Sequence, residues 1–175
     1  MPSPIGHGLA GLAVHLLASR DASELRAPVR AVLVVGAAIL PDVDLLFFFV
    51  DGRNHHNRET HSLGAAILAA AALFLLARGR RWPRPGALAV AVGAAWMTHV
   101  LLDYLNRDTT LPVGIMAFWP FDAGFYKSPW PLFLDIGRTL DLATVGHDAV
   151  AALWEFVVLT PLLLGAWRVR YRERV

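Results

Sequence analysis

The sequence contains no cysteine among its 175 residues, and only 17% of the residues are charged. The lack of cysteine excludes a disulfide framework, a thiolate metal site and a cysteine nucleophile, so a bound metal has to be held by His, Asp and Glu. The shortage of charge comes with a hydrophobic fraction of 56% and a mean hydropathy of +0.49, which no ordinary soluble domain shows. The composition therefore predicts an all-α protein embedded in a membrane.

The basic residues do not indicate a nucleic-acid partner. The formal net charge is only +2 although the isoelectric point is near 9.5. The arginines stand in short runs beside apolar segments, a position typical of residues that set membrane topology. We therefore expect membrane lipids as partners and no nucleic acid.

Five apolar runs separated by polar links predict an integral membrane bundle of about five helices. These runs occupy residues 5–19, 31–50, 61–77, 85–103 and 149–167. A long connection, residues 106–148, joins the fourth to the fifth and mixes aromatic residues with glycine and proline, which favours a re-entrant or interfacial segment. The sequence has no internal repeat and no low-complexity linker, so we predict one domain over residues 1–175.

The fourth apolar run ends in a histidine and an aspartate, His99 and Asp103. Residues four apart lie one turn above each other on the same face of a helix, so both side chains can reach one metal ion. The second run contains Asp42 and Asp44 next to Pro41. Carboxylates inside an apolar segment usually line a cavity or bind an ion. Alternatively, the helix ends at Leu40 and the two aspartates begin an interfacial loop.

Further histidines lie near the predicted helix starts. His7 stands in the first run, and the polar link before the third run contains His55, His56 and Glu59. Thr60 is a plausible N-cap that places His61 in the first helical turn. We predict His7, His56 and His61 as further metal ligands, and we interpret His55 as a loop residue.

The distribution of charge predicts a topology. Three segments, residues 20–30, 78–84 and 168–174, hold eleven of the 16 basic residues but only three of the 14 acidic ones. If these segments share one side of the membrane, that side is cytoplasmic, the N-terminus lies outside and the C-terminus inside. The predicted ligands then all fall in the outer half of the bundle, where four helices can bring them together. The complete predicted set is His7, Asp42, Asp44, His56, His61, His99 and Asp103.

Imidazoles combined with carboxylates favour a divalent metal, with Zn²⁺ preferred and Mn²⁺ or Fe as alternatives, and paired carboxylates allow one or two ions. Such a centre lowers the pKa of a bound water toward ~7, which makes hydrolysis the natural chemistry. No Gly-x-Ser-x-Gly motif is present to support covalent acyl transfer. Asp44 or Glu59 is the predicted general base and catalytic residue.

Several blocks together resemble one known family, the predicted inner-membrane-bound, metal-dependent hydrolases, some of which are described as LexA-binding. The blocks are Gly6-His7-Gly8, Leu40-Pro41-Asp42-Val43-Asp44, His56 with Thr60-His61-Ser62, His99 with Leu102-Asp103, and Trp119-Pro120-Phe121 after Gly114. In that family the histidine block usually reads His-Arg-x-x-Thr-His-Ser. Here the arginine, Arg58, comes one place later, so the resemblance assigns it no role.

This resemblance implies a multi-pass hydrolase of the inner (cytoplasmic) membrane that depends on a metal. More distantly the ligand types are similar to those of zinc-dependent phospholipase C, an all-helical protein, which favours a phosphoester in a lipid or headgroup-like substrate. Two other classes stay open: a metal-ion or proton transporter, and a membrane scaffold without enzymatic activity. The gathering of acidic residues at one end is unfavourable for a transport path.

Other residues are expected to have structural roles. We interpret His15 as a structural histidine and His147 as a surface residue, and we assign Asp135 no role in the site. Trp119, Phe121 and Trp130 are expected to act as anchors at the membrane interface.

Overall fold

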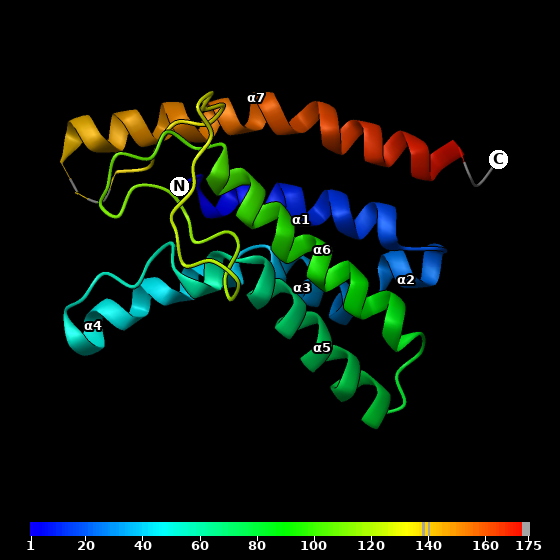
Figure 1. Ribbon diagram of the computed structural model, residues 1–175. Coiled ribbons are helices and arrows are strands. Elements are labelled where there is room, and N and C mark those ends of the chain that lie inside the picture. Colours follow the sequence, from blue (N-terminus) through cyan, green and yellow to red (C-terminus); the bar gives the residue numbers. More distant parts are fainter. Residues whose placement is uncertain (138, 140, 173–175) are drawn as a thin grey trace.

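The computed structural model describes residues 1–137, 139 and 141–172 of the chain (Figure 1). The predicted all-α class is confirmed, since the described residues form helices and no strand. The described residues form seven α-helices rather than about five, because one short helix lies in the predicted link 20–30 and another at the end of the predicted run 31–50. They are α1 (Pro4–Ala18), α2 (Ala22–Arg26), α3 (Pro28–Ala37), α4 (Phe48–Asp51), α5 (Leu63–Gly79), α6 (Pro85–Tyr104) and α7 (Leu142–Arg172), with 3₁₀ helices η1 (Leu40–Phe47) and η2 (Glu59–His61).

Helix α1 lies at the centre of the bundle and packs against α3, α6 and α7, while α5 packs against α6. Small residues permit this close approach, as is common between membrane helices. A Cβ on Gly11 would meet the Cβ of Ala38 at 2.8 Å, so glycine lets α1 lie directly on the end of α3. A cluster of buried residues from α3, α5 and α6, including Val34, Ala66 and Ala95, forms the main core.

The chain breaks direction at the end of α3. The segment Pro28–Ala37 and the segment Leu40–Asp51 are bent by 57° relative to each other. Pro41 lies in the first turn of η1, where its lack of an N–H group prevents the α-helix from continuing through it. The helix does end, at Ala37 rather than at Leu40. Asp42 and Asp44 lie in the 3₁₀ helix η1, which continues in a new direction, and not in a loop.

Two predicted boundaries are wrong. The N-cap of α5 is Ser62, whose side chain accepts from the Ala65 N–H, and not Thr60, so His61 stands in η2 ahead of the helix. The last helix begins at Leu142 rather than at residue 149, because Asp141 accepts from the Thr144 N–H at its start. The connection between α6 and α7 is correspondingly shorter, residues 105–141.

This connection folds back over the bundle. Its Ser128 N–H donates to Tyr104 O at 2.8 Å at the end of α6, and its Trp119 carbonyl accepts from Gly64 N at the start of α5 at 3.0 Å. A Cβ on Gly64 would meet that carbonyl oxygen at 2.5 Å, so the close approach depends on glycine. Phe121 and Trp130 are highly exposed on the connection, as expected for side chains at a membrane interface.

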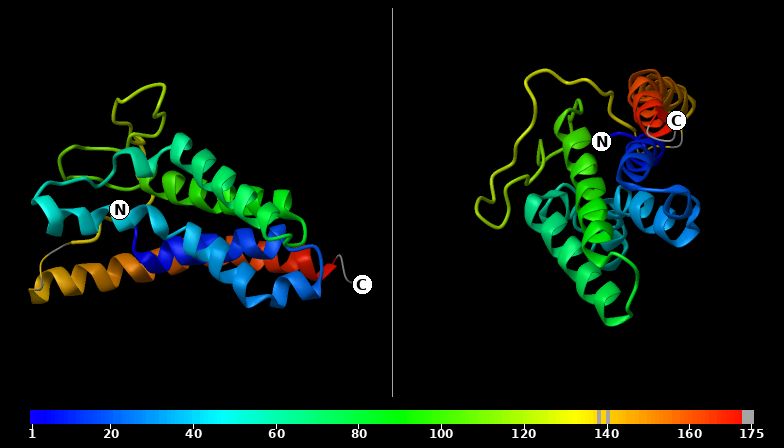
Figure 2. Two further views of the ribbon diagram at one scale, coloured as in Figure 1. Left: turned by 90° about the horizontal axis from the view of Figure 1, so that it is seen from below. Right: turned by 90° about the vertical axis from the view of Figure 1, so that its right-hand side faces the viewer.

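The molecule has two chemically different ends (Figures 1 and 2). Helix α2, the turn between α5 and α6 and the C-terminal part of α7 lie together at one end, which we call the arginine end. The opposite end carries α4 and the connection 105–141, and we call it the histidine end. Of the basic tail in the predicted topology, Arg168 and Arg170 lie at the arginine end, while Glu173 and Arg174 lie outside the described residues.

Helices α6 and α7 are long and apolar enough to cross a membrane, and the bent pair Pro28–Ala37 with Leu40–Asp51 allows a third span. Helices α1 and α5 are apolar but shorter. A membrane-embedded helical bundle therefore holds for the described residues.

Candidate metal centre

Four side chains from three elements meet at the histidine end. Asp42 comes from η1, His61 from η2, and His99 and Asp103 from α6, and one donor atom of each lies within 4.8 Å of the others. Three of them are buried, and Asp42 is nearly so. This group can hold a metal ion.

The distances from the two histidine nitrogens to the two aspartate oxygens are close to those of a tetrahedral site. His61 Nε2 lies 3.5 Å from Asp42 Oδ1 and 3.2 Å from Asp103 Oδ2. His99 Nε2 lies 3.6 Å and 3.0 Å from the same two oxygens. For a tetrahedral Zn²⁺ with bonds of ~2.0–2.1 Å, neighbouring donor atoms are about 3.3–3.4 Å apart. The residues present therefore fit a small divalent cation of tetrahedral preference.

The orientation of His99 follows from the break at Pro41. A 3₁₀ hydrogen bond to the Ala38 carbonyl would have to come from residue 41, and proline has no N–H to give. The His99 Nδ1 takes this place at 2.8 Å from Ala38 O. With Nδ1 as the donor, Nε2 is left as an acceptor that points at the two aspartates.

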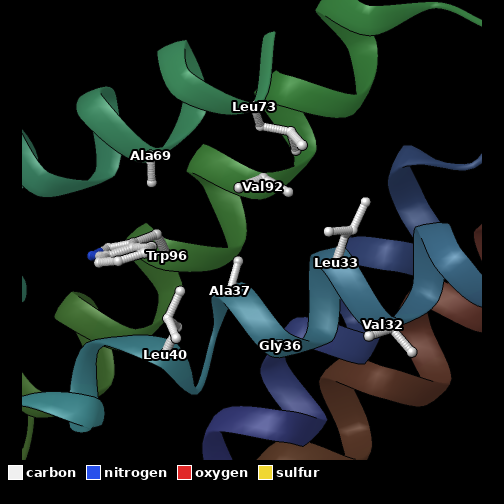
Figure 3. Close-up of a pocket in the computed structure, with 9 residues that line it drawn as sticks. All are labelled: Val32, Leu33, Gly36, Ala37, Leu40, Ala69, Leu73, Val92 and Trp96. Atoms are coloured by element: carbon white, nitrogen blue, oxygen red, sulfur yellow. The ribbon is translucent and has the colours of Figure 1, made fainter. Parts of the chain in front are cut away.

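The orientation of His61 depends on contacts between η2 and α6. Trp96, one turn before His99, donates from its indole Nε1 to Thr60 O at 2.8 Å. Trp96 also lines an apolar cavity of about 370 Å³ between α3, α5 and α6 (Figure 3). The other lining residues, such as Leu40, Leu73 and Val92, are apolar, so this cavity offers no ligands for a metal ion, in contrast to the His/Asp group.

His7 joins the group from the first turn of α1. Its ring stacks on that of His99, with centroids 3.7 Å apart and an interplanar angle of 18°, and its Nε2 lies 3.5 Å from Asp103 Oδ1. His7 is fully buried, and in the described part of the chain neither of its ring nitrogens has a hydrogen-bond partner. Two stacked imidazoles beside one carboxylate extend the set of available donor atoms to five residues.

A second group adjoins the first and consists of Asp44, His56 and His61. Asp44 Oδ1 lies 2.9 Å from His56 Nδ1, and Asp44 Oδ2 lies 3.1 Å from His61 Nδ1. Thr60 Oγ1 donates to Asp44 Oδ2 at 2.7 Å. Asp44 therefore fixes both imidazoles through their Nδ1 atoms and leaves the Nε2 atoms available.

The carboxylates also control the protonation of His61. Burial lowers the pKa of its imidazole, but the adjoining carboxylates of Asp103, Asp42 and Asp44 outweigh this and hold the pKa well above the ordinary 6.5. A cation that uses Nε2 as a ligand therefore has to displace a proton from His61.

Buried polar atoms without hydrogen-bond partners concentrate at this end. Within the described residues, both oxygens of Asp42 and of Asp103 and the Nε2 atoms of His56, His61 and His99 have no partner. Buried polar groups are normally satisfied, and unpaired ones are costly. Their convergence on one point is the pattern that a cation would satisfy.

The structure brings together all seven predicted ligands but not the second predicted base. Glu59 is exposed on η2 and belongs to neither group, because the 3₁₀ turn directs His61 inward and Glu59 outward. His55 lies 2.7 Å from Asp51 near the surface. His15 is buried at the arginine end, with Nε2 3.1 Å from Leu25 O.

His147, exposed in the second turn of α7, pairs with Asp135 of the connection at 3.5 Å.

Two polar residues were assigned no role from the sequence. Asn106, three residues beyond Asp103, is 1% exposed, and its side-chain amide has no partner among the described residues. Arg58 has a buried Nε that is likewise unpaired within the described chain. The signal for Asn106 was its position, since residues 99, 103 and 106 follow the helical repeat.

A comparison with protein families gives one match. The family described as "YdjM inner membrane protein" matches residues 1–173. No curated protein and no solved structure matches the chain.

Proposed function

Because the chain belongs to the YdjM inner membrane protein family and carries this His/Asp group, we propose that it is a membrane-bound, metal-dependent hydrolase of a phosphoester. One observation carries the proposal: donor atoms of Asp42, His61, His99 and Asp103 lie within 4.8 Å of one another, and each histidine Nε2 lies 3.0–3.6 Å from an oxygen of each aspartate. Their arrangement favours Zn²⁺, with Mn²⁺ or Fe as alternatives.

A bound divalent cation with a coordination position left for water would supply Lewis acidity and would lower the pKa of that water toward ~7. The chain itself offers a proton acceptor. His56 Nε2 is buried and, within the described residues, unpaired, while Asp44 Oδ1 holds the Nδ1 atom of the same ring at 2.9 Å. A carboxylate that fixes the tautomer of a histidine makes its other nitrogen a general base. For a single ion we therefore assign Asp44 to positioning and the proton transfer to His56.

Arg58 supports an anionic substrate. Its Nε is buried with no partner among the described residues, and it stands two positions after His56 and three before His61. The planar fork of a guanidinium matches the oxygens of a phosphate better than any other side chain. The exposed aromatics Phe121 and Trp130 at the same end favour a lipid or headgroup-like phosphoester at the interface.

The distribution of charge supports a multi-pass orientation. The three segments with eleven of the 16 basic residues include helix α2, the turn between α5 and α6 and the C-terminal part of α7, which lie at the arginine end, and eleven of the 14 acidic residues lie outside these segments. By the positive-inside rule we propose that the arginine end is cytoplasmic and that the metal centre faces the outer side.

The first experiment is the metal content of detergent-purified protein, with His99→Ala and Asp103→Ala beside the wild type and His55→Ala as the exposed control. We expect stoichiometric zinc, manganese or iron in the wild type and in His55→Ala, and its loss in the other two variants. Chromogenic phosphodiesters, phosphomonoesters and lipid phosphoesters are then assayed with the loaded protein.

Wild-type protein without metal, even after addition of each ion, would overturn the proposal. Bound metal without turnover, combined with metal uptake into vesicles that contain the protein, would instead favour a transporter.

A further inference from the structure

A buried carboxylate outside the metal centre lies in the middle of α7. Glu155 is 0% exposed although it belongs to a helix long and apolar enough to cross a membrane. Acidic residues in such segments are costly and are usually retained for a function. Neither of the two possible metal-binding groups found among the described residues includes Glu155.

The partner of Glu155 is the beginning of α1. Its Oε1 accepts from the Ser3 N–H at 2.7 Å, and its Oε2 accepts from the Ser3 hydroxyl. Ser3 is the N-cap of α1, and its hydroxyl oxygen also accepts from Gly6 N at 3.2 Å. A serine N-cap stabilises a helix start without help from another helix. The contribution of Glu155 is therefore to fix where α1 starts relative to α7.

One turn of helix α1 joins Ser3, which Glu155 holds, to His7 in the metal centre. The His7 N–H donates to Ser3 O at 3.2 Å, so the backbone held by Glu155 is bonded directly to His7. His7 has no hydrogen bond of its own at either ring nitrogen within the described residues, so its position beside Asp103 and His99 depends on the backbone that carries it.

Gly6 shows how closely the two helices fit at this point. A Cβ on Gly6 would lie 2.5 Å from Glu155 Oε2 and 3.0 Å from its Cδ. A methyl group there would displace the Glu155 carboxylate from its bonds to Ser3 and so release the start of α1. Glycine next to His7 and glutamate at position 155 are thus two parts of the same contact.

We propose that Glu155 is a positioning residue for the metal centre, which through Ser3 holds His7 against Asp103 and His99. This inference rests on the proposed function for the role of the centre. The position of His7 itself can be tested without metal or activity.

The test is modification of histidines by diethyl pyrocarbonate in metal-free, detergent-purified protein, read for each residue by peptide mass spectrometry. Wild type, Glu155→Ala and Glu155→Gln are compared, and Leu153→Ala, an exposed position on the same helix, is the matched control. His15 in the same helix α1 reports whether the fold persists, and the partly exposed His55 reports full reactivity.

We expect Glu155→Ala to raise the modification rate of His7 at least about tenfold through local opening, with His15 still protected. Glu155→Gln keeps an acceptor for the Ser3 N–H and should protect His7 as the wild type does. In Gly6→Ala the His7 rate should also rise, and adding Gly6→Ala to Glu155→Ala should have little further effect, because the carboxylate it collides with is gone.

Unchanged protection of His7 in Glu155→Ala would overturn the proposal. Joint exposure of His7 and His15 would also overturn it, because Glu155 would then hold the whole bundle.

A second readout is metal affinity. Groups that orient metal ligands change affinity by about 10–100-fold. Glu155→Ala and His7→Ala should weaken binding by the same factor, and the double variant should be no weaker than either. Additive losses would contradict a role through His7. If the wild type binds no metal, the proposed function fails while the modification experiment still decides the role of Glu155.

Discussion

His7 and His15 lie on the same helix, both fully or almost fully buried, and they differ in what surrounds them. His15 belongs to the arginine end, where Nε2 lies 3.1 Å from the Leu25 carbonyl. His7 belongs to the histidine end, where neither of its nitrogens finds a hydrogen bond among the described residues and its neighbours are Asp103 and another imidazole.

The arginine end and the histidine end as a whole also differ in how their polar side chains are paired. At the arginine end, Arg30 donates to the Ala18 carbonyl at 2.8 Å, Ser19 donates to the His15 carbonyl at 2.6 Å, and Glu24 pairs with Arg84. The first two of these contacts join a side chain to a backbone carbonyl at a helix end, and the third is an ion pair between side chains. At the histidine end, most of the buried polar atoms without a hydrogen-bond partner among the described residues face one another. Polar residues of the same kind therefore serve structure where the backbone pairs with them, and are the candidates for ligands where it does not.

Of the effects that we predict, the loss of thermal stability on removal of the metal should be the largest. A ligand that binds only the folded state stabilises it by about 4 kcal/mol at 1,000 times its dissociation constant. We expect a chelator to lower the thermal midpoint of the metal-loaded protein, and re-addition of the metal to restore it. Asp103→Ala is the control, and its midpoint should not respond to chelator. If the thermal midpoint of the wild type also fails to respond to the chelator, the two ends do not differ in metal binding.

The spacing of His99 and Asp103 and the two aspartates inside an apolar run allowed the sequence to predict which side chains gather at the histidine end. Helical spacing fixes which residues share a face, and charges inside apolar runs are rare enough to be informative. The separate roles of Asp42 and Asp44 could not be predicted. In the 3₁₀ helix η1 the former faces the Nε2 atoms of His61 and His99, and the latter faces the Nδ1 atoms of His56 and His61.

Contacts between distant segments were also beyond sequence reasoning. Ser3 and Glu155 are 152 positions apart, and neither residue has a local signal for the other. The choice between Thr60 and Ser62 as N-cap likewise depended on a tertiary contact. The Thr60 hydroxyl donates to Asp44, and Ser62 accepts from Ala65 N at the start of α5 instead.

Replacement of the two α1 histidines sharpens the comparison. His15→Ala removes a buried hydrogen bond and should lower the free energy of unfolding of the metal-free protein by about 1–3 kcal/mol. His7→Ala removes no hydrogen bond and should cost less in the same state. The order of the two variants should reverse for metal affinity, because only His7→Ala weakens metal binding. Denaturant unfolding with and without metal measures both effects, and equal responses of the two variants would contradict the assignment.

The smallest expected effect is that of replacing His55, which we compare with its neighbour His56. His55 pairs with Asp51 near the surface, whereas His56 is 2% exposed and bonded to Asp44. Exposed ion pairs contribute little to stability. His55→Ala should therefore leave the thermal midpoint, metal content and any phosphoesterase turnover unchanged.

His56→Ala should lower turnover by about 10²–10⁴-fold if His56 is the general base, and for a single ion it should retain most of the metal. Loss of metal together with turnover would instead place His56 among the ligands and favour two ions, since Asp44, His56 and His61 then form the second binding group.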